Sequence, residues 1–480
     1  MSVDEELAFL SARELVARYR DGSLSPVEAT RATLDRIAAL QDTLNAYCLI
    51  DGEAAMAAAR ASEARWCGDA PLGLFDGVPT SIKDIVLTRG WPTLRGSRTI
   101  ERDQDWADDA PPVARLREHG AVLLGKTTTP EFAMKGVTDS PLTGITRNPW
   151  NPDLTPGGSS GGAGAAVAAG LCALALGTDA GGSIRIPASF CGVFGHKPSY
   201  GRVPVWPPTP FGTFASTGPM SRTVADAALM LNAIAEPDAR DWNALPYDGT
   251  DYCERLDEGI EGVRIAYSPT LGYAEVDREV AAIVETSIDA LVECGAHVEL
   301  EDPGFADPAP FWHVLFRGLT RFAFKDMTEE QLAVMDPIVA EKIRATPGVD
   351  LETYLQAERR RAELGAHMRA FHRRYDLLVS PATAVAAFPV GRATPDRGPG
   401  ADATEWPFSL PFNLTRQPAA SVPCGFTADG RPVGLQIVGP PHADALVLRA
   451  ARAFETARPW FARRPPHPSS NGGVQRPAWR

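Results

Sequence analysis

The sequence predicts an α/β fold in which a single domain is built around one large sheet. Three short apolar runs follow Gly77, separated by turns and helical stretches: VPTSIKDIVL, AVLLGK and CALALGTD. Such alternation is typical of an α/β core. Strand-like runs return near the C-terminus as YDLLVSPA, AASVPCGF and VGLQIVG. We therefore expect the C-terminal part to complete the sheet, so that residues 71–462 form one domain.

Helices are expected before the sheet. Pro26 stands at the first position of one of them, and residues 52–65 form a further, alanine-rich helix. Two capping boxes, in which a hydroxyl precedes a carboxylate by three residues, mark the starts of the first two helices: Ser11 with Glu14, and Ser25 with Glu28. Residues 1–70 are thus predicted to be a helical segment packed on the core.

Two further regions differ from the core in composition. Residues 240–375 contain longer charged helical stretches, which we expect to form a variable helical cover rather than to build the sheet. The tail over residues 463–480 is rich in Pro, Ser and Gly and is expected to be mobile.

Composition and charge exclude several functional classes. The chain has 480 residues, 44% hydrophobic and 22% charged, as in ordinary globular proteins. Its formal net charge of −13 gives no basic surface for nucleic acid or an anionic membrane. No secretory signal opens the chain, so a cytoplasmic location is expected. The seven cysteines are scattered without a CxxC pair, so we expect no disulfide framework, metal or cofactor.

One uncharged stretch is long enough to cross a bilayer. No charge occurs between Asp153 and Asp179, a gap longer than the ~20 residues that a membrane helix needs. The stretch consists of Gly, Ala and Ser rather than bulky apolar residues. It is therefore predicted to be a buried helix that runs into a buried strand, and no contact with a membrane is expected.

The stretch from Thr155 to Gly201 holds two glycine-serine clusters. Glycines adopt positive φ angles and let other groups approach closely, so such a turn can present bare amides beside a hydroxyl. Ser183 follows an apolar run and precedes a helix-compatible stretch, which places it near a helix N-terminus. Amides there can stabilise the oxyanion of an acyl-transfer intermediate by about 3–4 kcal/mol per donor: Ala180, Gly181, Gly182 and Ser183.

A nucleophilic serine needs a base within hydrogen-bond reach. None of the eight histidines lies in a recognisable catalytic sequence, and His196 is interpreted as structural. Lys83 lies in an apolar strand-like segment in which alternation turns Asp84 to the opposite face. A lysine desolvated in this way, with no carboxylate facing it, loses basicity and can accept a proton. By itself, the pattern also fits a lysine that extends its amine to solvent.

A resemblance to a known family distinguishes these two interpretations of Lys83. Seven segments resemble the amidase signature family, in family order and through most of the chain: PLGLFDGVPTSIKD, GKTTTPEFA, NPWNPDLTPGGSSGG, GTDAGGSIRIPASFCGVFGHKPSYGRVP, GPMSRTVADAALML, YDLLVSPAT and SVPCGFTADGRPVGLQIVG. The resemblance implies a large central mixed sheet flanked by helices on both faces. It also implies hydrolysis of amide bonds through an acyl-enzyme.

The resemblance further implies a Ser-cisSer-Lys triad. Lys83 is then the base, Ser159 the bridging serine and Ser183 the nucleophile. The bond between Gly158 and Ser159 is then a cis peptide, which is rare outside proline. Three more residues match family positions and are interpreted as supports that shape the glycine turns: Ser160, Asp179 and Arg185.

Other interpretations of the glycine-rich motif meet obstacles. Residues 158–162 also fit the GxSxG elbow of α/β-hydrolases, which would make Ser160 the nucleophile, but that motif needs a strand directly before it. The preceding NPWNPDLTPG instead predicts a loop. A phosphate-binding loop would need a lysine after its glycines, and GGSSGGAG has none.

Two alternatives remain within the family. The chain could be the glutaminase component (the A subunit) of a tRNA-dependent amidotransferase, which releases ammonia from glutamine for a partner. A non-catalytic subunit or scaffold of the same fold conflicts with the presence of the three triad residues. Otherwise the expected partner is a small amide or carbamate, and the expected assembly is a homodimer.

Variable segments are expected to form the substrate pocket: residues 130–145, 204–217, 310–325 and 405–415. Seven aromatic residues in them indicate an apolar or aromatic acyl or leaving group, although core packing explains them equally well: Trp206, Phe211, Phe214, Phe311, Trp312, Phe316 and Phe322. Aryl amides, carbamates, hydrazides and esters all stay open as substrates, because the same acyl-enzyme chemistry serves each.

Overall fold

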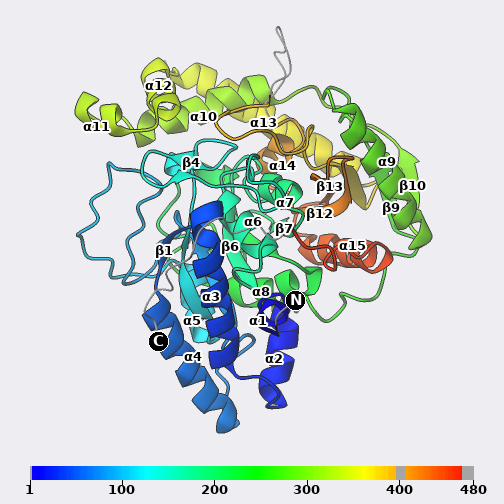
Figure 1. Ribbon diagram of the computed structural model, residues 1–480. Helices are drawn as coiled ribbons and strands as arrows, with labels where there is room; N and C mark the ends of the chain where they lie inside the picture. Colours follow the sequence, from blue (N-terminus) through cyan, green and yellow to red (C-terminus); the bar gives the residue numbers. More distant parts are fainter. Residues whose placement is uncertain (1–2, 347, 396–405, 467–480) are drawn as a thin grey trace.

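A mixed sheet of 11 strands forms the centre of the molecule (Figure 1). The computed structural model describes residues 3–346, 348–395 and 406–466. The strands of the N-terminal half are β1 (Tyr47–Ile50), β2 (Pro79–Lys83), β3 (Val122–Thr127), β6 (Leu174–Asp179), β7 (Phe194–Lys197) and β8 (Ser216–Ser221). Those of the C-terminal half are β9 (Arg264–Tyr267), β10 (His297–Leu300), β11 (Leu377–Pro381), β12 (Ala419–Phe426) and β13 (Pro432–Val438).

The strand order joins the two halves of the chain into this one sheet. The order is β1-β3-β2-β6-β8-β7-β12-β13-β11-β9-β10. Parallel pairing joins β3, β2 and β6 in one half and β11, β9 and β10 in the other, and the remaining pairs are antiparallel. β12 pairs with β7 in the middle. The prediction that C-terminal strands complete a mixed sheet is confirmed.

Helices cover both faces of the sheet. The helices up to β9 are α1 (Val3–Ala8), α2 (Ala12–Arg20), α3 (Pro26–Leu44), α4 (Gly52–Cys67), α5 (Pro111–Glu118), α6 (Gly161–Ala168), α7 (Arg185–Cys191) and α8 (Val224–Ile234). The later ones are α9 (Arg278–Glu293), α10 (Ala309–Ala323), α11 (Glu329–Val334), α12 (Pro337–Ala345), α13 (Leu351–Phe371), α14 (Leu410–Leu414) and α15 (Asp444–Ala457). Short 3₁₀ turns lie at Glu131–Ala133 and Gly212–Phe214, and β4 (Asp139–Ser140) pairs with β5 (Gly144–Ile145).

Strand β6 shows how the two faces are packed. Leu174 and Leu176 lie in a core shared with α5, α8, α9 and α15, whereas Ala175 lies in a core shared with α3, α4 and α6. Successive side chains of a strand point to opposite faces. The sheet is therefore buried on both sides here, as the resemblance implied.

The predicted N-terminal helices are confirmed. Ser11 caps α2 and Ser25 caps α3, and both capping boxes are complete. Pro26 is the first residue of α3, and the alanine-rich helix α4 extends from Gly52 to Cys67.

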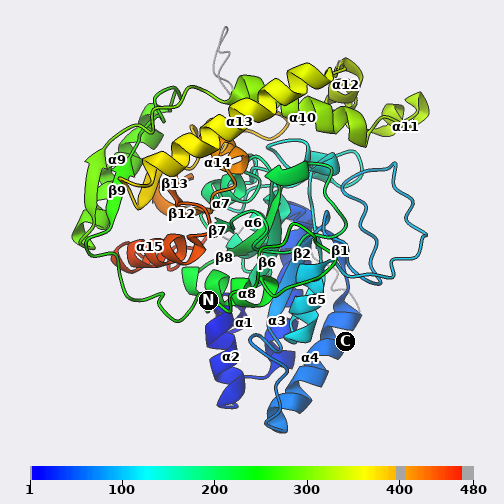
Figure 2. The same cartoon turned by 180° about the vertical axis from the view of Figure 1, so that it is seen from behind.

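The expected helical cover over residues 240–375 is correct for its helices but missed two strands. Helices α10 to α13 lie together at one side of the molecule, away from α2, α3 and α4 (Figure 2). However, β9 and β10 form one edge of the central sheet. Each has only four residues, and three of the four in β10 are exposed, so neither is long enough to show the apolar run of a buried strand.

The uncharged stretch before Asp179 forms the buried helix α6 and the largely buried strand β6, as predicted. Within the part of the chain that the structure describes, no helix is long and apolar enough to cross a membrane. Of the tail expected to be mobile, residues 467–480 lie outside the described residues.

Candidate active site

Lys83 is the last residue of β2 and is fully buried. β2 and β6 are parallel neighbours, so their C-terminal ends meet at one edge of the sheet. The amine Nζ of Lys83 lies 2.7 Å from Oγ of Ser159 and 2.9 Å from Oγ of Ser160, both of which directly precede α6. It also lies 2.9 Å from Oγ1 of Thr178, on β6. Three hydroxyls thus surround this amine.

The surroundings of Lys83 favour its neutral form. Burial holds the pKa of its amine well below the usual value, although the charge of Asp179 acts in the opposite direction. Asp84, the next residue, instead lies 4.0 Å from the amine of Lys126. The prediction that Asp84 faces away from Lys83 is confirmed.

The two glycine-serine clusters come together beside this lysine. The amide of Ser160 donates a hydrogen bond to the carbonyl of Ser183 over 3.1 Å. Ser159 is almost fully buried, whereas Ser183 is partly exposed, and both line the same pocket. The peptide between Gly158 and Ser159 is cis, as the resemblance implied. No hydrogen bond joins the hydroxyls of Ser159 and Ser183 in the described structure.

Asp179 and Arg185 form a buried ion pair under the second cluster. Arg185 donates to both carboxylate oxygens of Asp179, at 3.0 and 2.9 Å, and also to the side chains of Asn413 and Gln436. Burial alone would raise the pKa of the Asp179 carboxyl, but Arg185 holds it well below its usual range. Every charge here is therefore paired, which buried charges require.

This carboxylate also shapes the turn that holds Ser183. Its oxygens accept hydrogen bonds from the amides of Gly182, at 2.7 Å, and Ile184, at 3.1 Å. The expectation that the Gly182 amide contributes to an oxyanion hole is therefore wrong in this geometry, because that amide already has an acceptor. Among the described residues, the amides of Ala180, Gly181 and Ser183 have no such acceptor.

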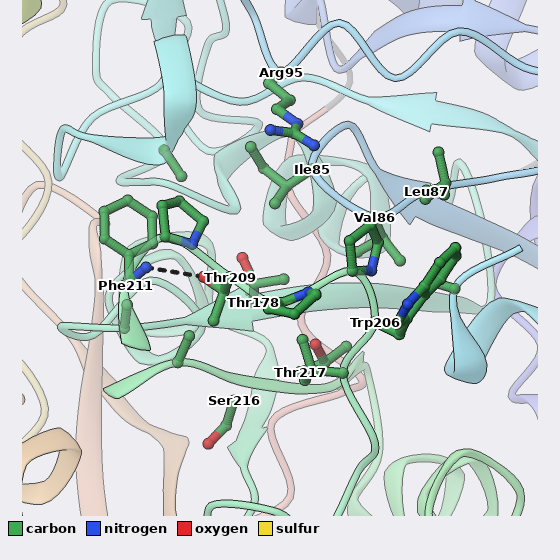
Figure 3. Close-up of a pocket in the computed structure, with 18 of the residues that line it drawn as sticks. Ile85, Val86, Leu87, Arg95, Thr178, Trp206, Thr209, Phe211, Ser216 and Thr217 are labelled. Atoms are coloured by element: carbon green, nitrogen blue, oxygen red, sulfur yellow. Dashed lines mark hydrogen bonds between the residues drawn. The ribbon is translucent and has the colours of Figure 1, made fainter. Parts of the chain in front are cut away.

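A pocket opens over Ser183 and is lined mainly by apolar side chains (Figure 3). We call it the inner pocket; its volume is about 120 Å³, and residues 85–87, 132–133, 204–211 and 215–217 form its walls. A wider space of about 630 Å³ shares Ser183 with it, and we call this the outer pocket. It lies between residues 133–136 and the helices α10 and α12, and it includes Trp406 and Leu410.

Four of the seven predicted aromatic residues line these pockets. Trp206 and Phe211 line the inner pocket, and Phe211, Trp312 and Phe316 the outer one. The other three do not line either: Phe214 and Phe311 pack in a separate core, and Phe322 is exposed. All four segments predicted to form the pocket contribute to it.

Two parts of the site were not predicted. Thr178 contacts Lys83 from the neighbouring strand, and its position directly before Asp179 in the family motif was the available signal. The loop after β2 contributes Ile85, Val86, Leu87 and Arg95 to the inner pocket. The apolar sequence IVL favoured a longer strand, whereas the chain turns at Asp84 and places these side chains in the pocket.

The remaining predictions concern histidines and metals. His196 is fully buried, and its Nε2 lies 3.2 Å from Asp444, which fits the structural role predicted for it. His313 is exposed on α10 at the outer pocket. Nowhere in residues 3–346, 348–395 and 406–466 do three or more His, Cys, Asp or Glu side chains form a group that could hold a metal ion.

Comparison with known proteins identifies the family of this chain. The profile of the Amidase family matches residues 28–448. The chain belongs to the amidase signature family. This amidase signature hydrolase is 40% identical over 474 residues to an acylamidase of Rhodococcus erythropolis, an alignment that covers 96% of this chain and 98% of the relative.

Two further proteins of the family are similar to this chain over nearly its whole length. The A subunit of the glutamyl-tRNA(Gln) amidotransferase of Chloroflexus aurantiacus is 36% identical over 493 residues, covering 96% of this chain and 99% of the relative. The crystal structure of a bacterial aryl acylamidase of the amidase signature enzymes superposes with a TM-score of 0.89 at 32% identity, covering 95% and 97% of the two chains. The expected fold is therefore confirmed.

Proposed function

We propose that this protein hydrolyses amides of small carboxylic acids through an acyl-enzyme on Ser183. The observation that carries the proposal is the buried amine of Lys83, which lies 2.7 Å from the hydroxyl of Ser159 with no carboxylate hydrogen-bonded to it. A neutral amine is a base, and an adjacent base is what a serine nucleophile needs. The acylamidase relative supports the same chemistry.

The hydrogen bonds around Lys83 suggest how the proton moves. The hydroxyl of Ser160 donates to the carbonyl of Thr178 over 3.1 Å, so its oxygen accepts from Lys83. A neutral amine has two N–H groups, which Ser160 and Thr178 can accept, and one lone pair. That lone pair is then directed to the hydroxyl proton of Ser159. Ser160 and Thr178 are therefore positioning residues for the base.

The reaction would proceed as two acyl transfers. Ser159 passes its proton to Lys83 and takes the proton of Ser183, whose oxygen attacks the amide carbonyl. Free amides at Gly181 and Ser183 are available to the oxyanion. The proton then returns through Ser159 to the leaving nitrogen, and the C–N bond breaks. Water next passes a proton through Ser159 to Lys83 as it attacks the ester carbonyl, and that proton returns to the oxygen of Ser183 when the acid leaves. Carbamates, hydrazides and esters can follow the same steps.

The test compares substrates and variants together. Wild type, Ser183→Ala and Lys83→Ala are incubated with chromogenic anilides, primary amides, carbamates and glutamine, and the release of aniline or ammonia is followed. Both variants should lose activity by about 10⁴-fold or more. Ser216→Ala is the matched control, because Ser216 lines the inner pocket and its hydroxyl has no partner in the described structure. An active Ser183→Ala protein would contradict the assignment.

A second candidate function is that of the glutaminase component of a tRNA-dependent amidotransferase, which the 36% identical relative favours. In that case only glutamine should release ammonia, and only when the partner proteins are added. The walls of the inner pocket formed by Ile85, Val86 and Trp206 suit a substrate with an apolar body. The same substrate panel therefore distinguishes the two functions.

A further inference from the structure

Arg95 is the one charged side chain among the described residues that line the inner pocket. Figure 3 shows its guanidinium directed toward Ile85, on the wall formed by the loop after β2. The rest of the lining is apolar or carries hydroxyls, and it contains no carboxylate. A cation thus lies in a mostly apolar cavity beside Ser159 and Ser183.

Among the described residues Arg95 forms no ion pair and donates no side-chain hydrogen bond. Burial lowers the pKa of its guanidinium, and the charge of Asp84 only partly offsets this effect. Asp84 is engaged elsewhere, because it lies 4.0 Å from Lys126 and accepts the amide of Gly96 over 3.2 Å. Arg95 is half-buried, and a charge that is partly removed from water without a partner is costly.

The backbone that presents Arg95 is also unusual. Arg95 has a φ of 54°, and Phe132 and Ala133, across the same wall, have φ angles of 51° and 60°. The amide of Phe132 donates a hydrogen bond of 2.8 Å to the carbonyl of Arg95, which fixes the backbones of the two segments relative to each other. Residues other than glycine rarely adopt such φ angles, and the strained residues that do so cluster at active sites and ligand-binding sites.

The outer pocket has the same sign of charge. Arg317 on α10 and Lys342 on α12 line it; among the described residues, neither forms an ion pair and no carboxylate lines this pocket. Lys135, which also lines it, is paired with Asp139 and Asp336. This contrasts with the net charge of −13 for the whole chain. A path lined by one sign of charge attracts ligands of the opposite sign.

We propose that Arg95 binds a carboxylate of the substrate, so that the preferred substrates are amides or carbamates with an apolar body and an anionic end. This inference rests on the proposed function and names its substrate class. A guanidinium presents a planar fork that matches a carboxylate in two parallel hydrogen bonds. Arg95 is thereby a specificity-determining residue, whereas the chemistry stays with Ser183.

Matched substrate pairs test this proposal. One pair places the carboxylate on the acyl side, as the mono-4-nitroanilide of glutaric acid against the 4-nitroanilide of pentanoic acid. The other places it on the amine side, as N-butyryl-4-aminobenzoate against butyranilide. For at least one pair, wild type should have a kcat/KM about 10- to 100-fold higher for the anionic member, the usual range for hydrogen bonds to a charged group.

Variants assign that preference to Arg95. In Arg95→Met the ratio of the two kcat/KM values should fall to about 1, and Arg95→Lys should retain part of it. Arg321→Met is the matched control, because it removes the same charge from an exposed position on α10 and should keep the wild-type ratio. The proposal is overturned if wild type prefers the anionic member of neither pair, or if the ratio survives Arg95→Met.

A binding measurement separates this inference from the proposed function. Isothermal titration of Ser183→Ala with both substrate pairs needs no turnover, and the anionic member of at least one pair should bind about 10-fold more tightly. Tighter binding that depends on Arg95, in a protein that hydrolyses no amide, would leave the inference standing without the function. Hydrolysis with equal binding of the two members of both pairs would leave the function standing and overturn the inference.

Discussion

At the scale of single residues, the proposed chemistry depends on one lysine whose pKa is held well below its usual value. An ammonium group has no lone pair and cannot accept a proton from Ser159. Burial of Lys83 among hydroxyls lowers its pKa and so favours the neutral amine, and the ion pair between Asp179 and Arg185 keeps the nearby carboxylate occupied. In the proposed mechanism, desolvation makes Lys83 a neutral base, the role that a neutral histidine has in many serine hydrolases.

The lowered pKa predicts the pH dependence of the reaction. In the folded protein the pKa of Lys83 lies well below 10.5, so kcat/KM should rise as the pH increases through that lowered pKa and level off above it. The measurement is kcat/KM as a function of pH with an uncharged anilide, so that the substrate does not titrate. A profile that rises only near the ordinary lysine pKa would show that Lys83 is charged at neutral pH.

The ion pair below the nucleophile predicts a large effect on stability. Asp179→Asn leaves Arg185 buried without its counter-charge and should lower the free energy of unfolding by about 3–5 kcal/mol. The matched control is Asp429→Asn, which breaks an ion pair with Arg431. The Asp429 side chain is 61% exposed, so this substitution should lower the free energy of unfolding by less than about 1 kcal/mol. Urea denaturation measures both; equal effects would contradict the importance of burial.

Acid should weaken the same pair. The pKa of Asp179 is lowered on folding, so its stabilising contribution is present above its unfolded value near 3.8 and is lost as the pH falls through the lowered folded pKa. In Asp179→Asn this part of the acid dependence should be absent. Unfolding midpoints of both proteins, measured from neutral to acidic pH, check the difference.

The site was predictable where the sequence carries it in contiguous motifs. Lys83, Ser159 and Ser183 lie in family segments, and the cis peptide before Ser159 followed from the same match. Arg95 carries no such signal, because a pocket-facing arginine and a solvent-facing one have the same local sequence. The occupied amide of Gly182 likewise depends on where Asp179 turns its carboxylate, which only the folded structure shows.

At the scale of elements, buried charged residues connect helix α12 of the helical cover to residues 131–135 beside the active site. Asp336 caps α12 by accepting the amides of Ile338 and Val339, and it pairs with Lys135. Its own amide donates to Glu131, which also accepts the hydroxyl of Ser97. Helix α12 in turn supplies Lys342 to the outer pocket. The position of the cover and the shape of the pocket mouth are thus coupled.

Replacing this anchor should loosen α12 locally. Asp336→Ala loses both the cap and the buried ion pair, so the free energy of local opening over residues 337–345 should fall by about 2 kcal/mol or more. KM should rise more than kcat falls, because the mouth changes while the base and nucleophile do not. Hydrogen exchange of this helix measures the opening.

The control for this prediction removes a cap alone. Asp350 caps α13 through the amide of Thr353 and forms no buried ion pair. Asp350→Ala should therefore affect exchange only in the first turn of α13, and KM should stay as in wild type. If Asp336→Ala behaves in the same way, the ion pair with Lys135 contributes nothing to the cover.

The elements that the sequence missed share a physical cause. Strand β10 is the edge strand and β9 lies next to it. Both have only four residues and begin at an exposed polar residue, Arg264 or His297, so their sequences give little strand signal. The capped helices α2 and α3 were predictable because a cap is a local interaction between residues three apart. Sheet order depends on contacts between distant segments, and the family resemblance supplied what local patterns could not.

At the scale of the whole molecule, one buried junction joins three distant parts of the chain. Arg222 donates to the carbonyl of Leu10, and Asp226 accepts the amides of Ala12, at 3.0 Å, and Arg13, at 3.1 Å. Glu455, on the C-terminal helix α15, accepts the amide of Val224. Burial raises the pKa of the Asp226 carboxyl, although these amide donors lower it. The N-terminal helices are therefore part of the core that supports β6 and β8.

Deleting residues 1–22 should therefore destabilise the entire domain rather than remove a separate part. The deletion leaves Asp226 buried without its two amide donors, and each buried group left unsatisfied costs about 1–3 kcal/mol. It also exposes the apolar surface against which Leu15 and Tyr19 pack. We expect the free energy of unfolding to fall by about 4 kcal/mol or more, with activity lost in parallel. Asp226→Asn, which keeps one acceptor oxygen, should have an intermediate effect in the same urea titration. An unchanged unfolding midpoint in the shortened chain would show that the catalytic sheet is stable without its N-terminal helices.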